Sequence, residues 1–141
     1  MGRKLRMGMG GGGMDSFIGA IHRKAAVMAG QIDFISGALS SDEKRAKDSA
    51  RKQLLNENRS YGSWEEMLEK ESNLHRSERI DFVSIVTPNH THFPISKAFI
   101  EAGFHVICDK PMTYSLDEAK KLIKKGLSSY REVLTKKKFI F

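Results

Sequence analysis

Apolar residues along this chain follow two different patterns, which alternate from one segment to the next. The clearest continuous run is 81–87, which contains the segment FVSIV. Such a run is typical of a strand that is covered on both faces in a parallel sheet. Between 17 and 29 the apolar residues recur every three or four positions instead, which predicts an amphipathic helix that packs on one face.

The same alternation extends over most of the chain. Strands are predicted at 5–9, 33–39, 81–87 and 105–108, the last two buried, and helices at 17–29, 40–55, from 63 onward, 93–102 and 115–125. Three helix starts have the spacing of a capping box: Ser40 with Glu43, Ser63 with Glu66, and Ser115 with Glu118. Because parallel neighbours need crossover connections, residues 1–125 are predicted to form a doubly wound α/β domain with helices on both faces. Residues 126–141 are predicted to be a basic tail, with one last strand or a truncated continuation.

Composition and charge restrict the class of protein. The 141 residues are 40% hydrophobic and 29% charged, which suits one globular domain. The net charge of +7 comes from the last 22 residues, where eight Lys and Arg accompany one acidic residue. A terminal charge run indicates a solvated tail, so we expect no nucleic-acid partner.

The remaining composition bears on location and metals. No apolar run approaches the roughly 18 residues of a membrane span, so we expect no membrane partner. The single cysteine, Cys108, excludes an internal disulfide and a cysteine-based zinc site. We therefore expect no metal site, and a cytoplasmic location.

Four consecutive glycines follow the first predicted strand. A strand that ends in glycines and opens a helix binds phosphate, because helix N-terminal N–H groups carry partial positive charge and glycine allows close approach. Gly8, Gly10 and Gly13 match G-x-G-x-x-G, but Gly8 falls inside the strand. We therefore take Gly11 and Gly13 as the first two glycines and Gly19 as the third, which lets the helix pack closely. A flexible tight turn is the alternative.

The end of the second strand bears on the ribose of a dinucleotide. A carboxylate there holds the free 2′-hydroxyl of NAD, whereas small polar residues near a cation admit the 2′-phosphate of NADP. Here the strand leads into Ser40 and Ser41, and Asp42 comes too late. Lys44 and Arg45 are close enough to meet a phosphate, so the pattern favours NADP over NAD. The two serines equally suit helix capping.

Two further polar segments follow predicted strands, where open α/β sheets bind ligands. The first contains Thr87, Pro88, Asn89 and His92, and the second contains Asp109, Lys110 and Pro111. A lysine ammonium beside a nicotinamide ring can donate to a substrate hydroxyl and favour the oxyanion that forms as hydride leaves carbon. Taken singly, His92 equally suits a cap and Lys110 a solvated loop.

In order and spacing, these segments resemble the glucose–fructose oxidoreductase / inositol dehydrogenase (Gfo/Idh/MocA) family. The segments that carry the resemblance are Gly11-Gly12-Gly13, Gly19-Ala20-Ile21-His22, Thr87-Pro88-Asn89 with His92, Ala102-Gly103-Phe104-His105-Val106 and Asp109-Lys110-Pro111. The match covers about residues 4–125, with Asp109 in place of the usual glutamate. The resemblance implies a Rossmann domain that binds NAD or NADP and serves oxidation or reduction of a sugar, cyclitol or related polyol.

The resemblance also implies a role for each matching residue. The residues that it implies near the pyrophosphate are Gly11, Gly12, Gly13, Phe17 and Ile18. Those that it implies near the adenosine ribose are Ser40 and Ser41. Those that it implies along the rest of the cofactor are Thr87, Pro88, Asn89 and His92. Lys110 would lie between nicotinamide and substrate, as the catalytic residue.

Members of the family continue into a second α/β domain, which walls the substrate pocket, supplies an acid/base group and often mediates assembly. The resemblance fades from Gly126. We therefore expect the family's nucleotide-binding domain without its substrate domain, which leaves turnover of substrate by this chain alone open. We also expect exposed apolar surface at the sheet edge and hence self-association. The alternative is a non-catalytic nucleotide-binding sensor or interaction module.

Overall fold

The computed structural model describes residues 2–136 of the protein, with side chains up to Gly126. The strands are β1 (Leu5–Gly11), β2 (Ile32–Ala38), β3 (Phe82–Val86) and β4 (His105–Cys108). The α-helices are α1 (Phe17–Met28), α2 (Glu43–Lys52), α3 (Trp64–Asn73), α4 (His92–Glu101) and α5 (Leu116–Lys136). Two short 3-10 helices, η1 (Glu57–Arg59) and η2 (Asn89–Thr91), complete the described elements.

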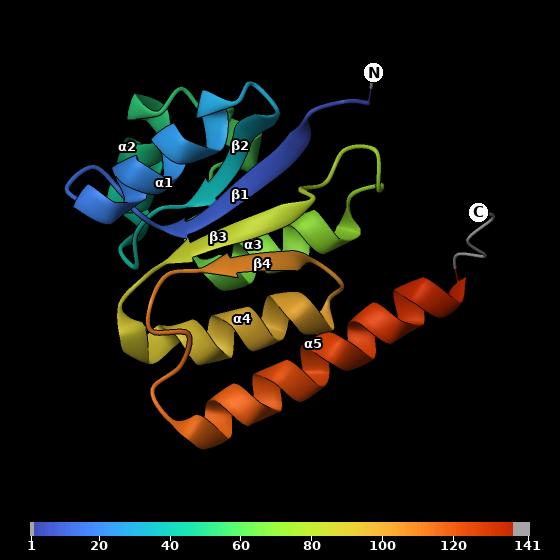
Figure 1. Ribbon diagram of the computed structural model, residues 1–141. Helices are drawn as coiled ribbons and strands as arrows, with labels where there is room; N and C mark the ends of the chain where they lie inside the picture. Colours follow the sequence, from blue (N-terminus) through green and yellow to red (C-terminus); the bar gives the residue numbers. More distant parts are fainter. Residues whose placement is uncertain (1, 137–141) are drawn as a thin grey trace.

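The four strands form one parallel sheet in the order β2-β1-β3-β4. Helices α1 and α2 cover one face, whereas α3 and α4 cover the other and α5 lies beside α4 (Figure 1). The chain thus winds to both sides of the sheet, which confirms the predicted doubly wound Rossmann-type fold. Within residues 2–136, no helix has both the length and the apolarity that crossing a bilayer requires.

The hydrophobic core lies in two layers because strand side chains alternate between the two faces. On β3, Phe82 and Val86 pack toward α1 and α2, whereas Val83 and Ile85 pack toward α3 and α4. All five residues of β3 are buried, as the continuous apolar run predicts. The central position of β1 and β3 therefore fixes the two strand ends from which the candidate site is built.

Strand β4 is less buried than the sequence pattern predicts. His105 and Ile107 are exposed, and 51% of the surface of Ile107 is accessible to solvent. Among the described elements β4 pairs only with β3, so helices cover one face of an edge strand and leave the other open. The expectation of a buried strand at 105–108 is wrong for this reason. Self-association through such exposed apolar surface stays a prediction.

Two predicted helix boundaries also differ from the structure. Helix α2 begins after Asp42, whose Oδ1 accepts from the Arg45 N–H at 2.7 Å, so Asp42 and not Ser40 is the N-cap. Helix α5 does not end at Gly126 but continues to Lys136, because one glycine costs only about 1 kcal/mol within a good helical sequence. Residues 126–136 therefore form no strand, and 137–141 lie outside the described residues.

Of the other two predicted capping boxes, the one at Ser115 forms completely, whereas at Ser63 the Glu66 carboxylate accepts from the Gly62 N–H, at 2.8 Å, instead of the Ser63 N–H. Ser63 Oγ accepts from the Glu66 N–H at 3.2 Å, which starts α3. Ser115 Oγ accepts from the Glu118 N–H, and a Glu118 carboxylate oxygen accepts from the Ser115 N–H, both at 3.2 Å. These contacts satisfy backbone donors that a helix start leaves without partners.

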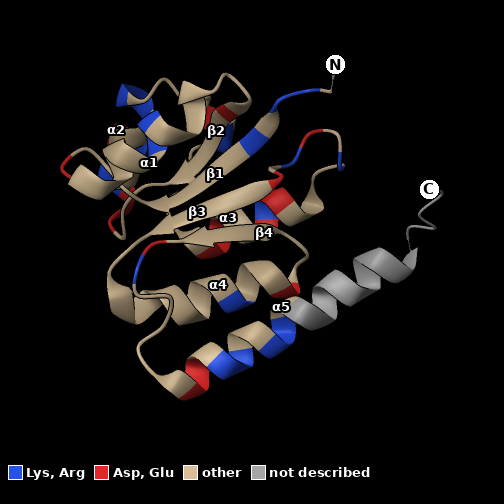
Figure 2. Ribbon diagram, viewed as in Figure 1, with Lys and Arg blue, Asp and Glu red and all other residues tan. Residues whose placement is uncertain are grey.

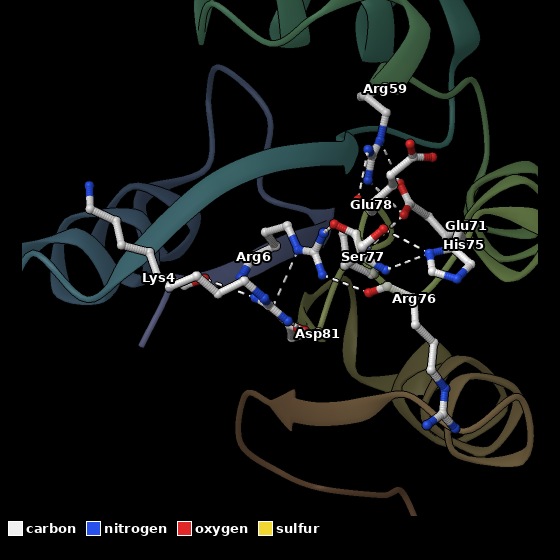
Figure 3. Close-up of polar contacts among 11 residues, drawn as sticks. Lys4, Arg6, Arg59, Glu71, His75, Arg76, Ser77, Glu78 and Asp81 are labelled. Atoms are coloured by element: carbon white, nitrogen blue, oxygen red, sulfur yellow. Dashed lines mark hydrogen bonds and ion pairs between the residues drawn. The ribbon is translucent and has the colours of Figure 1, made fainter. Parts of the chain in front are cut away.

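A buried carboxylate ties α3 to the sheet. Glu71 is fully buried and accepts from Arg59, Ser36, Tyr61 and the backbone N–H of Ile80 at 2.8–3.1 Å. Figure 3 shows Arg59 reaching this carboxylate. Burial, followed by the negative charge of Glu71, raises the pKa of Tyr61 to about 12, so its hydroxyl remains a donor.

Asp81 fixes the amino ends of β1 and β3. Its carboxylate accepts two hydrogen bonds from the Arg3 guanidinium and one from the Arg6 N–H, each 2.7 Å long. The Arg3 contact is the main reason that the pKa of Asp81 is lowered well below its usual value. Arg6 and Asp81 lie together in Figure 3. This anchor stabilises the sheet at the strand starts.

Candidate functional site

A cleft of about 790 Å³ lies at the carboxyl ends of β1, β2 and β3. Four connections line it: the β1–α1 turn, the end of β2 with the start of α2, the start of α3, and the segment between β3 and α4. The lining residues are Gly11–Ser16, Ala38–Ser41, Arg45, Ser49, Ser63–Glu65, Val86–Pro88, His90, Thr91 and Ile95. This is the sheet edge at which open α/β domains bind ligands.

The β1–α1 turn requires glycine for two reasons. Gly11 and Gly12 have φ of +76° and +75°, a left-handed conformation that other residues rarely adopt. A Cβ on Gly19 would lie 2.4 Å from the Cα of Gly12, so α1 packs directly against the turn. The predicted packing role of Gly19 is confirmed, and the strand before it runs to Gly11, two residues beyond the predicted end.

Neighbouring side chains hold the turn in place. Arg23 Nη1 donates to the Gly12 carbonyl oxygen at 2.5 Å, and partial burial lowers the pKa of this guanidinium. The N–H of Met14 donates to Ser49 Oγ at 3.2 Å. A Cβ on Gly13 would lie 2.6 Å from the carbonyl oxygen of Leu39, which leaves room only for glycine.

Helix α1 begins at the cleft, and the partial positive charge of its N-terminus favours a bound anion there. Its N-cap is Ser16, whose Oγ accepts from the Gly19 N–H at 3.1 Å. Its first turn contains no acidic residue. The partial positive charge of the helix start is thus available to an anion beside Gly11–Gly13, and glycine allows backbone N–H groups to approach such an anion closely.

The β2 side of the cleft carries hydroxyls and an ion pair. Ser40 and Ser41 line the cleft as predicted from their place after the strand. Arg45 also lines it, and Arg45 Nη2 lies 2.9 Å from Asp15 Oδ2 on the opposite turn. The sequence analysis missed Asp15, although a charged residue at the start of the glycine-bounded helix was a visible signal.

The β3 side divides the predicted residues into two groups. Thr87 and Pro88 line the cleft, whereas Asn89 and His92 do not. His92 is 1% exposed. Its Nε2 lies 2.8 Å from the Thr87 carbonyl oxygen and its Nδ1 2.7 Å from that of Pro111. His92 therefore joins the loop after β3 to the loop after β4.

Lys110 lies on the exposed loop after β4 and outside the cleft lining. The peptide bond from Lys110 to Pro111 is cis. The preceding residue, Asp109, donates its N–H to the Ile85 carbonyl oxygen at 2.9 Å, and its Oδ1 lies 3.6 Å from His22 Nε2. The loop that carries Lys110 is thus attached to both β3 and α1.

Phe17 and Ile18 take different positions beside the cleft. Phe17 is 80% exposed and Ile18 packs against the core under α1, so neither lines the cleft. The structure thus gathers seven predicted residues in the cleft, namely Gly11, Gly12, Gly13, Ser40, Ser41, Thr87 and Pro88. It keeps five outside the lining, namely Phe17, Ile18, Asn89, His92 and Lys110.

Trp64 and Glu65 are cleft residues that the sequence analysis missed. They begin α3, whose start the capping box of Ser63 predicts. The available signal was their place directly after a predicted N-cap, since the carboxyl ends of the strands and several helix starts meet at one side of such a domain. Trp64 is the single tryptophan of the chain.

The lysines on the first part of α5 lie away from this cleft. Figure 2 shows them on the coloured part of α5, which packs beside α4, whereas the charged residues of the cleft lining are Arg45, Asp15 and Glu65. Among the side chains that the structure describes, up to Gly126, no cluster of three or more His, Cys, Asp or Glu is placed to hold a metal ion. The cleft therefore favours an anion through backbone and helix-end groups more than through side-chain charge.

Comparison with known proteins gives one family for almost the whole chain. Residues 5–129 match the model of the Gfo/Idh/MocA oxidoreductase family, described as having an NAD-binding Rossmann fold. The chain is 36% identical over 121 residues to the uncharacterized oxidoreductase YfiI of Bacillus subtilis, covering 85% of this chain and 30% of that protein. It is 34% identical over 116 residues to the D-xylose 1-dehydrogenase (NADP(+)) 2 of Haloferax volcanii, covering 79% and 30%.

A solved structure supports the same assignment. An inositol dehydrogenase homolog from Azotobacter vinelandii, complexed with NADH and myo-inositol, has a TM-score of 0.87 and 35% identity. The similarity covers 92% of this chain and 34% of that one. The chain thus spans about a third of the length of the relatives it matches. On the family match and the shared fold, this chain belongs to the Gfo/Idh/MocA oxidoreductases and contains their NAD-binding Rossmann fold.

Proposed function

We propose that the cleft binds NAD(H) or NADP(H) with the pyrophosphate at the Gly11–Gly13 turn, and that the chain is the nucleotide-binding part of an oxidoreductase. The observation that carries this proposal is the glycine turn itself. It follows a central strand, starts α1 and opens into a cleft of about 790 Å³. Backbone N–H groups and a helix start together form a typical pyrophosphate site.

The adenosine ribose then falls at the end of β2. Ser40 and Ser41 line the cleft there without a carboxylate at the strand tip, and Arg45 lies beside them. This combination admits a 2′-phosphate, so NADP(H) is expected to bind at least as tightly as NAD(H). Relatives support both cofactors, since one solved structure contains NADH and the Haloferax enzyme is described with NADP(+).

The substrate class proposed for the whole protein is a sugar, cyclitol or related polyol. Its support is the chemistry named for relatives, which are described with myo-inositol and D-xylose. When bound, the nicotinamide exchanges a hydride with the substrate carbon. Lys110 is the proposed catalytic residue, whose ammonium donates to the reacting oxygen and stabilises the negative charge that develops there.

The proposed role of Lys110 also depends on how its loop is held. His92 bonds the loop at Pro111, and Asp109 joins it to β3 and α1. These contacts support a fixed lysine position at the carboxyl edge of the sheet. The chain spans about a third of the length of its relatives, so dinucleotide binding is proposed for this chain and polyol turnover for the whole protein.

Fluorescence titration with NADH and NADPH tests the proposal. Trp64 lines the cleft and is the single tryptophan, so excitation of Trp64 should transfer energy to a bound reduced nicotinamide. We expect a saturable signal for both nucleotides at micromolar concentrations. Trp64→Phe should remove the transfer but leave binding detectable by calorimetry. Absence of binding of either nucleotide at high micromolar concentrations would refute the proposal.

A nucleotide sensor without catalysis is the second candidate, and the position of Lys110 outside the cleft lining favours it. Lys110→Ala should leave NADH affinity of this chain within about twofold, because the side chain is exposed and away from the cleft. In a longer protein that contains this chain, the same change should abolish polyol turnover. Unchanged turnover would remove Lys110 from catalysis and favour the sensor.

A further inference from the structure

Asp15 and Arg45 form an ion pair between two walls of the cleft. Asp15 belongs to the β1–α1 turn and Arg45 to the first turn of α2, and both line the cleft. The Nη2–Oδ2 distance is 2.9 Å, and the side chains are 79% and 65% exposed. The Arg45 N–H is held by Asp42 at 2.7 Å, so the backbone of Arg45 is fixed and Asp15 orients its guanidinium.

This pair reduces the charge that the cleft offers to phosphate. Arg45 is the one Lys or Arg among the lining residues of the described chain; it pairs with Asp15, and Glu65 supplies a second carboxylate to the lining. A guanidinium binds a phosphate with two parallel hydrogen bonds. A phosphomonoester such as the 2′-phosphate of NADP carries about −1.5 to −2 charges at neutral pH. Asp15 and this phosphate therefore compete for the same guanidinium.

We propose that Asp15 sets the balance between NADP(H) and NAD(H) by holding Arg45 away from the 2′-phosphate. The inference rests on the proposed dinucleotide site and adds a specificity-determining residue to it. Binding of NADP(H) breaks the ion pair, whereas binding of NAD(H) leaves it intact. Because both side chains are largely exposed, the pair is weak and the restraint amounts to a severalfold change in affinity.

The test measures the Kd of NADPH and of NADH for variants of the 141-residue chain by calorimetry. In Asp15→Asn, and equally in Asp15→Ser, the affinity ratio of NADPH over NADH should rise roughly three- to fivefold, the range of one exposed ion pair. Arg45→Gln should lower the ratio. In the Arg45→Gln background, the Asp15→Asn change should then leave the ratio unchanged, because its effect acts through Arg45.

Two controls separate this pair from a general charge effect. Asp33 lies at the start of β2, and its carboxylate is 2.9 Å from the ammonium of exposed Lys4. Asp33→Asn removes a charge equal to that of Asp15 and should not change the affinity ratio of NADPH over NADH. Glu65→Gln removes the other carboxylate of the cleft lining and should change the ratio by less than Asp15→Asn.

Each other outcome has a definite meaning. An unchanged ratio in the Asp15 variants overturns the inference, as does an equal rise in Asp33→Asn or Glu65→Gln. A rise that persists after Arg45→Gln also overturns it, since Asp15 would then act without Arg45. Failure of the unmodified chain to bind either nucleotide refutes the proposed function itself, whereas binding with an unchanged ratio refutes only the role of Asp15.

Discussion

The Nδ1 atom of His92 lies 2.7 Å from the carbonyl oxygen of Pro111, nineteen positions along the chain. The other ring nitrogen lies 2.8 Å from the carbonyl oxygen of Thr87. One buried imidazole thus connects the loop after β3, which lines the cleft, to the loop that carries Lys110. The polar segments that follow the two strands are one connected unit.

Replacing this imidazole should loosen the Lys110 loop. His92→Leu removes the buried imidazole that contacts the carbonyl oxygens of Thr87 and Pro111, which should lower the free energy of unfolding by roughly 1 kcal/mol. Hydrogen exchange of the backbone around Pro111 should become faster. The control is His105→Ala on β4, where the side chain is exposed. Equal exchange in His92→Leu and the unmodified chain would contradict this role.

Adding a single methyl group at Gly19 should disturb the glycine turn. In Gly19→Ala the new Cβ would lie 2.4 Å from the Cα and 2.7 Å from the carbonyl oxygen of Gly12. We expect a loss of roughly 1–3 kcal/mol in stability and weaker binding of NADH, because α1 must move away from the turn. Gly10→Ala is the matched control, since its Cβ would have nothing within 4 Å. Similar NADH affinities for the two variants would argue against the turn as the binding element.

Removing the charge of Glu71 should destabilise the domain. Glu71→Gln leaves Arg59 facing a neutral group in a buried position, and breaking a buried pair of this kind costs roughly 3–5 kcal/mol. Urea unfolding monitored by circular dichroism measures the effect. Glu69→Gln changes an exposed residue of the same helix and should have an effect below about 0.5 kcal/mol. Comparable stabilities of the two variants would show that the buried pair is not needed.

Asp81 should stabilise the folded protein at neutral pH and lose this effect in acid. Its pKa is lowered in the folded protein, mainly by Arg3, whereas an unfolded Asp titrates near 3.9. The stabilisation is therefore complete above about pH 4 and is lost as the pH falls toward the lower folded value.

Unfolding measured between pH 2 and 7 tests this sign. Asp81→Asn should be less stable at pH 7, by roughly 1–2 kcal/mol for the lost charged hydrogen bonds. Its stability should also fall less steeply below pH 4 than that of the unmodified chain. Asp33→Asn, which removes a half-exposed ion pair, should behave nearly as the unmodified chain does. Parallel curves for Asp81→Asn and the unmodified chain would contradict the role of Asp81.

The sequence predicts the fold well where a residue pattern has one physical explanation. The continuous apolar run of β3 requires cover on both faces, and the strand–glycine–helix order requires the turn at Gly11–Gly13. It predicts β4 less well, because an edge strand and a central strand both contain apolar residues and only the neighbouring strands distinguish them. The same holds at Gly126, where the local preference of one glycine is weaker than that of the helix around it.

The candidate site shows a similar limit. Residues that directly follow strands, such as Ser40 and Thr87, are predictable because parallel strands end at one edge. Asp15 follows the glycine turn and Trp64 and Glu65 follow a predicted N-cap, so their local positions are visible in the sequence, but the meeting of these distant segments in one cleft depends on how the helices pack. His92 has a sequence position typical of a cofactor contact, yet the structure buries it between two carbonyl oxygens.

The most direct test of the central claim is a titration of the isotopically labelled chain with NADH, followed by the backbone amide resonances. If the turn binds the pyrophosphate, the largest shifts should arise at Gly11–Gly13 and the first residues of α1, with further shifts at Ser40 and Ser41, and all of them should saturate together. Shifts confined to α5 and its lysines, or no shift at Gly11–Gly13 at saturating NADH, would contradict the claim that this turn binds the dinucleotide.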